Sequence, residues 1–207
     1  YVMFSEVYWH HTVRSATAML QRAFFLLQPQ LDFGTLFQLG ESDWIAALAR
    51  LAGTEPAGEL VNGLFGPQRS LYKRLVQYSY FEQREMYERL ARRPYAWLVN
   101  VAEQFAARLA SHLGEPIAAH EVLFDAPPVE REIEFNVDVY FPKDQRYRKL
   151  ESVSPVVRAL AKEQFDDYVK RVRVYVHPRI VGRLRGVAEL ERLLNHAIDD
   201  CDAGRVR

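Results

Sequence analysis

The longest apolar stretch of the chain runs from Phe4 to Leu27 and has the spacing of a helix. One face repeats at intervals of three and four and is formed by Phe4, Val7, Tyr8, His11, Ser15, Ala18 and Met19. A second apolar face is formed by Val13, Ala16, Leu20, Phe24 and Leu27. A helix that is apolar on more than one face is normally buried on more than one side. We therefore expect this helix, which should stop near Pro29, to lie at the centre of the fold, with its histidine pair facing protein or a pocket.

Helical patterns continue as far as residue 115, separated by glycine and proline. Gly53, the Gly66-Pro67 pair and Gly114 are the expected stop signals, and Ser42 is a candidate N-cap. The predicted helices cover residues 43–52, 56–65, 68–92 and 94–113. The first half of the chain is thus expected to be helical throughout.

The pattern changes to a period of two after Pro116. Residues 121–125 form a short apolar segment, and residues 133–141 alternate strictly between apolar and polar. The remaining expected elements are a strand partner at 147–153, a helix at 154–168, a half-buried strand at 172–176, a last helix at 184–198 and a frayed acidic tail. The predicted fold is mainly α: a helical region over 1–115, then a small α+β unit over 116–207 with an antiparallel or mixed sheet.

Composition limits the classes of protein that need to be considered. The 207 residues suit one large domain or two small ones, and 49% hydrophobic residues are enough for a core. A formal net charge of zero gives no basic field that would favour nucleic acid. The single cysteine, Cys201, excludes an internal disulfide. Without a membrane-length apolar run or a signal peptide, we expect a cytoplasmic protein with no membrane partner. Because Tyr1 already belongs to a helical pattern with no cap before it, we expect a C-terminal portion of a longer protein.

No complete catalytic centre is visible among the reactive side chains. His10 and His11 are adjacent on a helix and point about a hundred degrees apart, whereas helical metal pairs are three or four residues apart. Neither a glycine-rich phosphate loop nor a Gly-x-Ser-x-Gly motif is present. The neighbouring aspartates make Cys201 a poor nucleophile. The sequence predicts that this chain binds no metal and is inactive by itself.

A basic cluster opens the predicted helix over 68–92. On that helix Arg69 and Lys73 share one face at its N-terminus, whereas Arg74 projects to one side. No acidic residue within four positions neutralises the cluster. Its spacing is compatible with a solvated basic face and with a phosphate clamp, in which arginine makes a forked contact and lysine acts as a point charge.

Two motifs resemble a family of HD-domain phosphohydrolases. The segment Val7-Tyr8-Trp9-His10-His11-Thr12-Val13-Arg14 is similar to a Tyr-x-His-Lys-Thr pattern that lies just past the metal centre of that family. The segment Arg69-Ser70-Leu71-Tyr72-Lys73 matches an Arg-x-Leu-aromatic-Lys motif. The β-rich end, with residues 150–155 after the strand pair, also looks like bacterial members. These enzymes, the SAM-and-HD-domain and dGTPase-like group, hydrolyse deoxynucleoside triphosphates to nucleoside and triphosphate.

The resemblance implies roles for several residues. Tyr8 would line the substrate pocket and pack on the sugar. His10 and His11 would occupy a regulatory nucleotide site near a subunit interface, with His11 in place of the family's lysine. Arg69 and Lys73 would hold the phosphates of that nucleotide, a deoxynucleoside or guanosine triphosphate. A divalent metal (Mn, Mg, Fe or Zn) would be bound by residues before Tyr1, and the parent protein would be a homodimer or homotetramer.

Two functions are therefore compatible with the sequence. The first is the regulatory and oligomerising portion of a dGTPase-like, metal-dependent HD-domain hydrolase. The alternative is a non-catalytic helical module whose basic segment recognises an acidic protein or nucleic acid.

Overall fold

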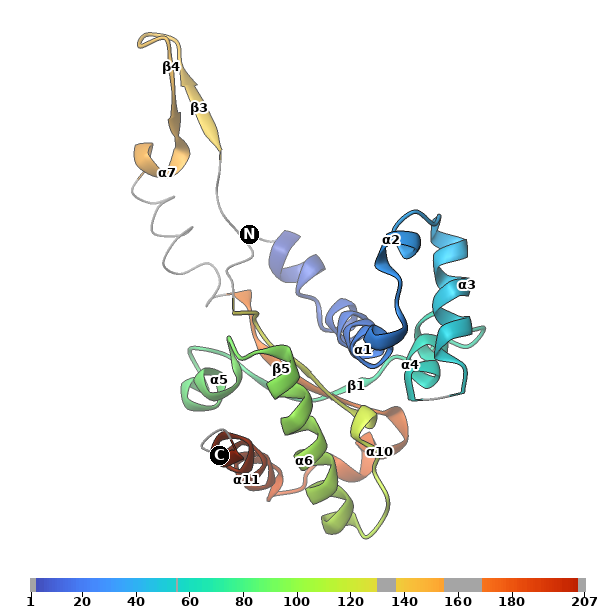
Figure 1. Ribbon diagram of the computed structural model, residues 1–207. Helices are drawn as coiled ribbons and strands as arrows, with labels where there is room; N and C mark the ends of the chain where they lie inside the picture. Colours follow the sequence, from blue (N-terminus) through green and yellow to red (C-terminus); the bar gives the residue numbers. More distant parts are fainter. Residues whose placement is uncertain (1–2, 55, 130–136, 155–168, 205–207) are drawn as a thin grey trace.

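The computed structural model describes residues 3–54, 56–129, 137–154 and 169–204. Over these residues the chain is mainly α-helical, with two small antiparallel sheets (Figure 1). The strands are β1 (Lys73–Tyr78), β2 (Val122–Asp125), β3 (Asp138–Phe141), β4 (Arg146–Lys149) and β5 (Val172–Val176). The helices are η1 (Phe4–Tyr8), α1 (His11–Leu27), η2 (Gln28–Gln30), α2 (Phe33–Leu36), α3 (Glu41–Ala52), α4 (Pro56–Phe65), α5 (Arg84–Leu90), α6 (Tyr95–Leu113), η3 (Ala119–Glu121), α7 (Leu150–Val153), α10 (Pro178–Leu184) and α11 (Leu190–Ala203). The predicted fold class, mainly α with a small α+β unit, is confirmed.

The larger sheet has the strand order β1-β5-β2, with both neighbours antiparallel to β5. The sequence predicted β5 to be half-buried, because valines alternate with Arg173 and Tyr175. That prediction is wrong, since all five residues of β5 are buried. The cause is its central position, where helices cover both faces of the sheet.

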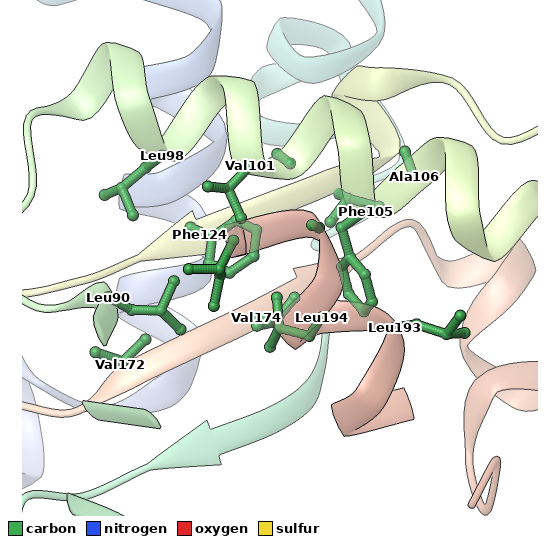
Figure 2. Packing of buried hydrophobic residues seen from close by; sticks show 14 of the residues in the cluster. Leu90, Leu98, Val101, Phe105, Ala106, Phe124, Val172, Val174, Leu193 and Leu194 are labelled. Carbon is green, nitrogen blue, oxygen red and sulfur yellow. The ribbon is translucent and has the colours of Figure 1, made fainter. Parts of the chain in front are cut away.

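The two faces of this sheet support two separate clusters of buried side chains. On the first face, valines of β5 and Phe124 of β2 pack against α6 and α11, and Figure 2 shows Phe105 and Val101 of α6 beside Val174. On the second face, Leu123 and Tyr175 pack against residues of α1, α3 and α4. Because successive side chains of a strand point to opposite faces, the same strands contribute to both clusters and the sheet lies between the two layers of helices.

The first apolar segment is not one continuous helix. The π-helical turn η1 ends at Tyr8, and His10 adopts an extended conformation with φ −60° and ψ 137° as the N-cap of α1. Between them Trp9 is 2% exposed. The guanidinium of Arg14 lies 4.2 Å from the centre of its indole, and Arg173 donates a 2.8 Å hydrogen bond to its carbonyl oxygen. The chain breaks here because the buried Trp9 is anchored to the sheet.

Polar contacts surround the anchored Trp9. Asp125 accepts hydrogen bonds from Nε of Arg14 at 3.0 and 3.1 Å, and Arg173 lies 3.6 Å from the same carboxylate. The side chain of Asp125 is 1% exposed and that of Arg173 is 5% exposed. This buried ion pair links α1 to the ends of β2 and β5.

The helix predicted over residues 68–92 is wrong. Residues 73–78 instead form β1, and a turn at Ser79 separates it from α5. The Ser79 hydroxyl accepts a 3.1 Å hydrogen bond from the backbone N–H of Glu82, a local contact that competes with helix formation. Pairing of β1 with β5 then decides the strand. The sheet consequently includes residues from the region that was expected to be entirely helical.

The last predicted helix, over 184–198, corresponds to α11, which begins and ends later than expected, and the preceding α10 was not predicted. α10 ends at Leu184, Gly186 has φ 86°, and α11 extends to Ala203. The acidic residues expected to fray belong to α11 and form ion pairs across to α5, α6 and the segment between them: Asp199 with Arg89, Asp200 with Arg108, and Asp202 with Arg93. Charge complementarity therefore continues the helix beyond its apolar pattern.

Smaller predictions have mixed outcomes. Helices α4 and α6 lie where they were predicted, but α3 is capped by Gly40, so Ser42 is inside the helix. β3 and β4 pair across a turn in which Asp144 N–H donates to the Phe141 carbonyl, but the strand predicted over 147–153 ends at Lys149, and residues 150–153 form α7. The predicted strand residues 133–136 and most of the predicted helix over 154–168 lie outside the described residues.

None of the helices in the described part of the chain has both the length and the apolar character of a membrane span.

Candidate functional site

A cavity of about 240 Å³ lies between the start of α1, the start of β1 and the segment between α10 and α11. It is lined by His11, Thr12, Ser15, Leu71, Tyr72, Lys73, Arg74, Tyr175 and Arg185. Residues from α1, from the start of β1, from β5 and from the segment after α10 therefore meet at one cavity. Its size is near the lower end of small-molecule sites.

The lining of this cavity is strongly cationic. Lys73, Arg74 and Arg185 carry positive charge, and no aspartate or glutamate is among the lining residues. Arg74 donates a 3.1 Å hydrogen bond to the side-chain oxygen of Gln77, which fixes part of its guanidinium. Arginine and lysine together are the residues that proteins use for phosphate and carboxylate groups. The cavity can thus hold an anion.

His11 adds a titratable group to the same cavity. Partial burial lowers the pKa of its imidazole, and the neighbouring His10, Arg74 and Arg173 lower it further. The two histidine rings lie 4.2 Å apart at a tilt of 43°. Because positive charges contribute to this lowering beside burial, a bound anion would raise the pKa of His11.

Two hydrogen bonds, one part-buried and one buried, hold α1 against the sheet at this point. The hydroxyl of Tyr175 donates to the carbonyl oxygen of His11 at 2.7 Å, and the hydroxyl of Ser15 donates to the carbonyl oxygen of Tyr72 at 2.8 Å. The register between β1 and β5 shifts between Arg74 and Val76. Lys73 and Arg74, which both precede this irregularity, both line the cavity.

The structure separates the residues that the sequence assigned to a single phosphate clamp. His11 and Lys73 line the cavity, whereas Arg69 is exposed in the segment before β1 and is not among the lining residues. Lys73 begins a strand, so the predicted placement of these cations at a helix N-terminus is wrong. Nδ1 of His10 accepts a 3.3 Å hydrogen bond from the backbone N–H of Thr12, so His10 caps α1. Tyr8 is 58% exposed outside the cavity.

Two cations of the cavity were missed by sequence reasoning. The sequence pattern placed Arg74 on the side of a helix and did not indicate Arg185. The signal for Arg74 was present, since it follows Lys73 directly in the basic cluster. Arg185 lies more than a hundred residues away and only the packing of α10 brings it near β1.

A second polar cluster lies on the other side of Tyr72. The carboxylate of Glu59 on α4 is 2.8 Å from Nε2 of His120 and 3.1 Å from Nε2 of His177. The His177 ring meets the Tyr72 ring edge-on at 5.3 Å, and His177 also caps α10 by accepting from Arg179 N–H. This cluster links α4 to η3 and α10.

Glu121 supports the same corner of the fold. Its carboxylate is bound by the guanidinium of Arg179 and accepts a 2.8 Å hydrogen bond from the backbone N–H of Ala118. Burial raises the pKa of the Glu121 carboxyl, but these hydrogen bonds and the charge of Arg179 outweigh burial and leave the pKa below its ordinary value. Glu121 is therefore expected to be ionised whenever the chain is folded near neutral pH.

The residues that the structure describes do not fit the divalent metal of an HD hydrolase. Within residues 3–54, 56–129, 137–154 and 169–204, no group of three His, Cys, Asp or Glu side chains could hold a metal ion. The histidine pair at the start of α1 has no acidic third member among those residues. No reaction step can be assigned to a metal on these side chains.

Comparison with known proteins identifies the class to which this fold and cavity belong. A family model described as the HD associated region matches residues 1–197. Because that match covers nearly the whole sequence, the chain belongs to the family of HD associated regions. It is a region that accompanies HD domains.

An uncharacterized protein of Methanocaldococcus jannaschii is similar to this chain. The two are 30% identical over 161 residues, which is 76% of this chain and 32% of that protein. The chain thus spans about a third of the length of this relative. No solved structure matches the chain.

Proposed function

We propose that this chain is the regulatory part of a metal-dependent HD-domain hydrolase that cleaves deoxynucleoside triphosphates to nucleoside and triphosphate. In this proposal the cavity beside α1 binds the phosphates of a deoxynucleoside or guanosine triphosphate. The observation that carries the proposal is the convergence of Lys73, Arg74 and Arg185 with His11 on one hollow that no carboxylate lines. The family membership and the two motifs support the same assignment.

Catalysis is assigned to the HD domain that such a region accompanies. The divalent metal of that domain would polarise a phosphate or supply hydroxide. The residues of this chain would act by binding and positioning: Lys73 as a point charge, Arg74 and Arg185 as forked donors, and His11 as a group whose proton affinity rises when the anion binds. Tyr8, exposed at the end of η1, is available to contact substrate held by the HD domain.

Assembly as a homodimer or homotetramer is part of the proposal. Met3, Val7, Tyr8 and Val13 are all exposed near the start of the chain. Apolar side chains grouped in this way are typical of a protein contact. We assign this surface to the HD domain or a second subunit, and the parent protein to the cytoplasm.

Titration calorimetry with dGTP and GTP tests the proposed phosphate site. The full chain should bind a nucleoside triphosphate, and affinity should fall as salt is added. A charge-assisted hydrogen bond contributes about 1.5–3 kcal/mol, so Arg74→Ala and Arg185→Ala should each weaken binding by roughly ten- to a hundredfold. Arg69→Ala is the matched control and should change affinity little. The sequence predicted the opposite ranking of Arg69 and Arg74.

Two outcomes would contradict the proposal. Equal losses for Arg69→Ala and Arg74→Ala would indicate a diffuse basic surface, as expected for the alternative of an acidic protein or nucleic acid partner. Absence of nucleotide binding by the wild-type chain would show that the cavity is not a nucleotide-binding site. The small volume of the cavity, about 240 Å³, favours a small anion over a macromolecule.

A further inference from the structure

The cationic cavity beside α1 is too small to enclose a whole nucleotide. Its volume of about 240 Å³ lies just below the range of about 300–1,000 Å³ that is typical of sites for drug-sized ligands. A nucleoside triphosphate that enters this cavity therefore places only part of itself inside. The lining residues decide which part enters.

Three of the lining side chains carry positive charge and are exposed, so that a ligand in the cavity can reach them. They are Lys73 and Arg74 of β1 and Arg185 from the segment after α10. Lysine acts on phosphate as a point charge, and arginine makes forked contacts with its oxygens. The 17-residue helix α1 begins at His11, which also lines the cavity, so the positive end of the helix dipole adds to the same potential.

The other polar groups of the lining are poorly placed to read a base. Tyr175 is fully buried and its hydroxyl donates to the His11 carbonyl oxygen, while the Ser15 hydroxyl donates to the carbonyl oxygen of Tyr72. Tyr72 is only 3% exposed. No Asn, Gln, Asp or Glu is among the lining residues that the structure describes. The His11 ring can stack on a nucleoside, but stacking accepts every base because each base has a π-face.

We infer that the cavity recognises the linear triphosphate chain itself, so that free inorganic triphosphate is a ligand of this site. Three linked phosphate groups are compact, and their charges match the three cations that meet here. The inference rests on the proposed function for the source of this ligand, because hydrolysis of a deoxynucleoside triphosphate would release triphosphate from the HD domain. Triphosphate would then compete with the regulatory nucleotide, and the cavity would respond to accumulating product.

Titration calorimetry of the full chain with sodium triphosphate, diphosphate and phosphate, without divalent metal, tests the inference. Triphosphate should bind saturably, and each phosphate group removed should weaken binding by about tenfold or more, because charge-assisted hydrogen bonds are lost. Lys73→Ala and Arg185→Ala should each weaken triphosphate binding by roughly ten- to a hundredfold. Arg69→Ala, an exposed cation outside the lining, is the matched control and should change affinity little.

A negative charge introduced into the cavity gives a second test. Thr12 lines the cavity and is exposed in the first turn of α1, where an acidic residue is favourable to the helix. Thr12→Glu should therefore fold, as circular dichroism would report, and should abolish triphosphate binding. Gln21→Glu is the control, since it adds the same charge to an exposed position about 14 Å further along the same helix. At that distance salt screens the charge, so affinity should change by less than about threefold.

The outcome for triphosphate is separable from the outcome for nucleotides. If dGTP and GTP bind but triphosphate neither binds nor displaces them, the inference is wrong and the proposed nucleotide site stands. If triphosphate binds with the expected dependence on Lys73 and Arg185 but no nucleotide binds, the triphosphate site stands and the proposed function is wrong. Equal affinity for triphosphate and phosphate, or unchanged triphosphate binding in folded Thr12→Glu, would also overturn the inference.

Discussion

The hydroxyl of Tyr175 donates a 2.7 Å hydrogen bond to the backbone carbonyl oxygen of His11, 164 positions earlier in the chain. Tyr175 is fully buried in the central strand, and His11 begins the helix that lines the cationic cavity. This contact makes the position of the first helix depend on a strand near the other end of the described chain. Burial raises the pKa of the Tyr175 phenol, so the hydroxyl remains a donor at neutral pH.

Tyr175→Phe should lower the free energy of unfolding by about 0.5–1.5 kcal/mol, because it removes one part-buried hydrogen bond while retaining the ring. Urea unfolding monitored by circular dichroism measures the change. Tyr147→Phe is the control, since Tyr147 is 68% exposed in the β3–β4 hairpin. Equal stability of the wild type and Tyr175→Phe would show that the His11 carbonyl is satisfied in another way.

Asp125→Asn should be much more destabilising. Arg14 and Arg173 share this buried carboxylate, and removing its charge leaves two cations uncompensated beside Trp9. Breaking a buried ion pair costs about 3–5 kcal/mol. The same urea assay applies, with a tryptophan fluorescence shift reporting exposure of Trp9.

Asp138→Asn is the control for burial. Its carboxylate is 52% exposed and pairs with Lys149 at 3.7 Å, so this variant should change the free energy of unfolding by less than about 1 kcal/mol. Similar effects of the two variants would refute the role given to burial.

Glu121 should contribute to acid unfolding. Its pKa in the folded chain lies below the ordinary value of 4.5, because hydrogen bonds and the charge of Arg179 outweigh burial. A group with a depressed folded pKa stabilises the fold fully above its unfolded pKa, and that contribution is lost as pH falls through the folded value. The free energy of unfolding should therefore fall with pH below 4.5 more steeply in the wild type than in Glu121→Gln. The comparison of slopes uses thermal or urea unfolding at several pH values.

A matched control isolates the effect of Glu121. Glu88 on α5 pairs with Arg84 at the surface and is 53% exposed. Glu88→Gln should leave the acid slope close to that of the wild type. A slope that is the same for Glu121→Gln and the wild type would place the acid sensitivity on other carboxylates.

The sequence determined the elements whose signals are local. Proline and glycine placed α4 and α6 correctly, because they set backbone conformation at the point where a helix begins or ends. Strict alternation and β-branched residues placed β5 and identified the β3–β4 pair. The motif around Lys73 also identified one true member of the cationic cavity.

Only the tertiary structure decided which of these elements meet. Residues 73–78 are compatible with helix or strand, and the pairing with β5 selects the strand. Because residues 73–78 form a strand, Arg74 lines the cavity and Arg69 does not. Arg185 joins the cavity because α10 packs near β1, a relation that no local pattern encodes. The same applies to Trp9, which breaks the first helix because it contacts Arg14 and Arg173, and the carboxylate of Asp125 on a third segment pairs with both arginines. Long-range pairing outweighs local propensity at each of these positions, since burial and ion pairing together contribute more free energy than helix preference does.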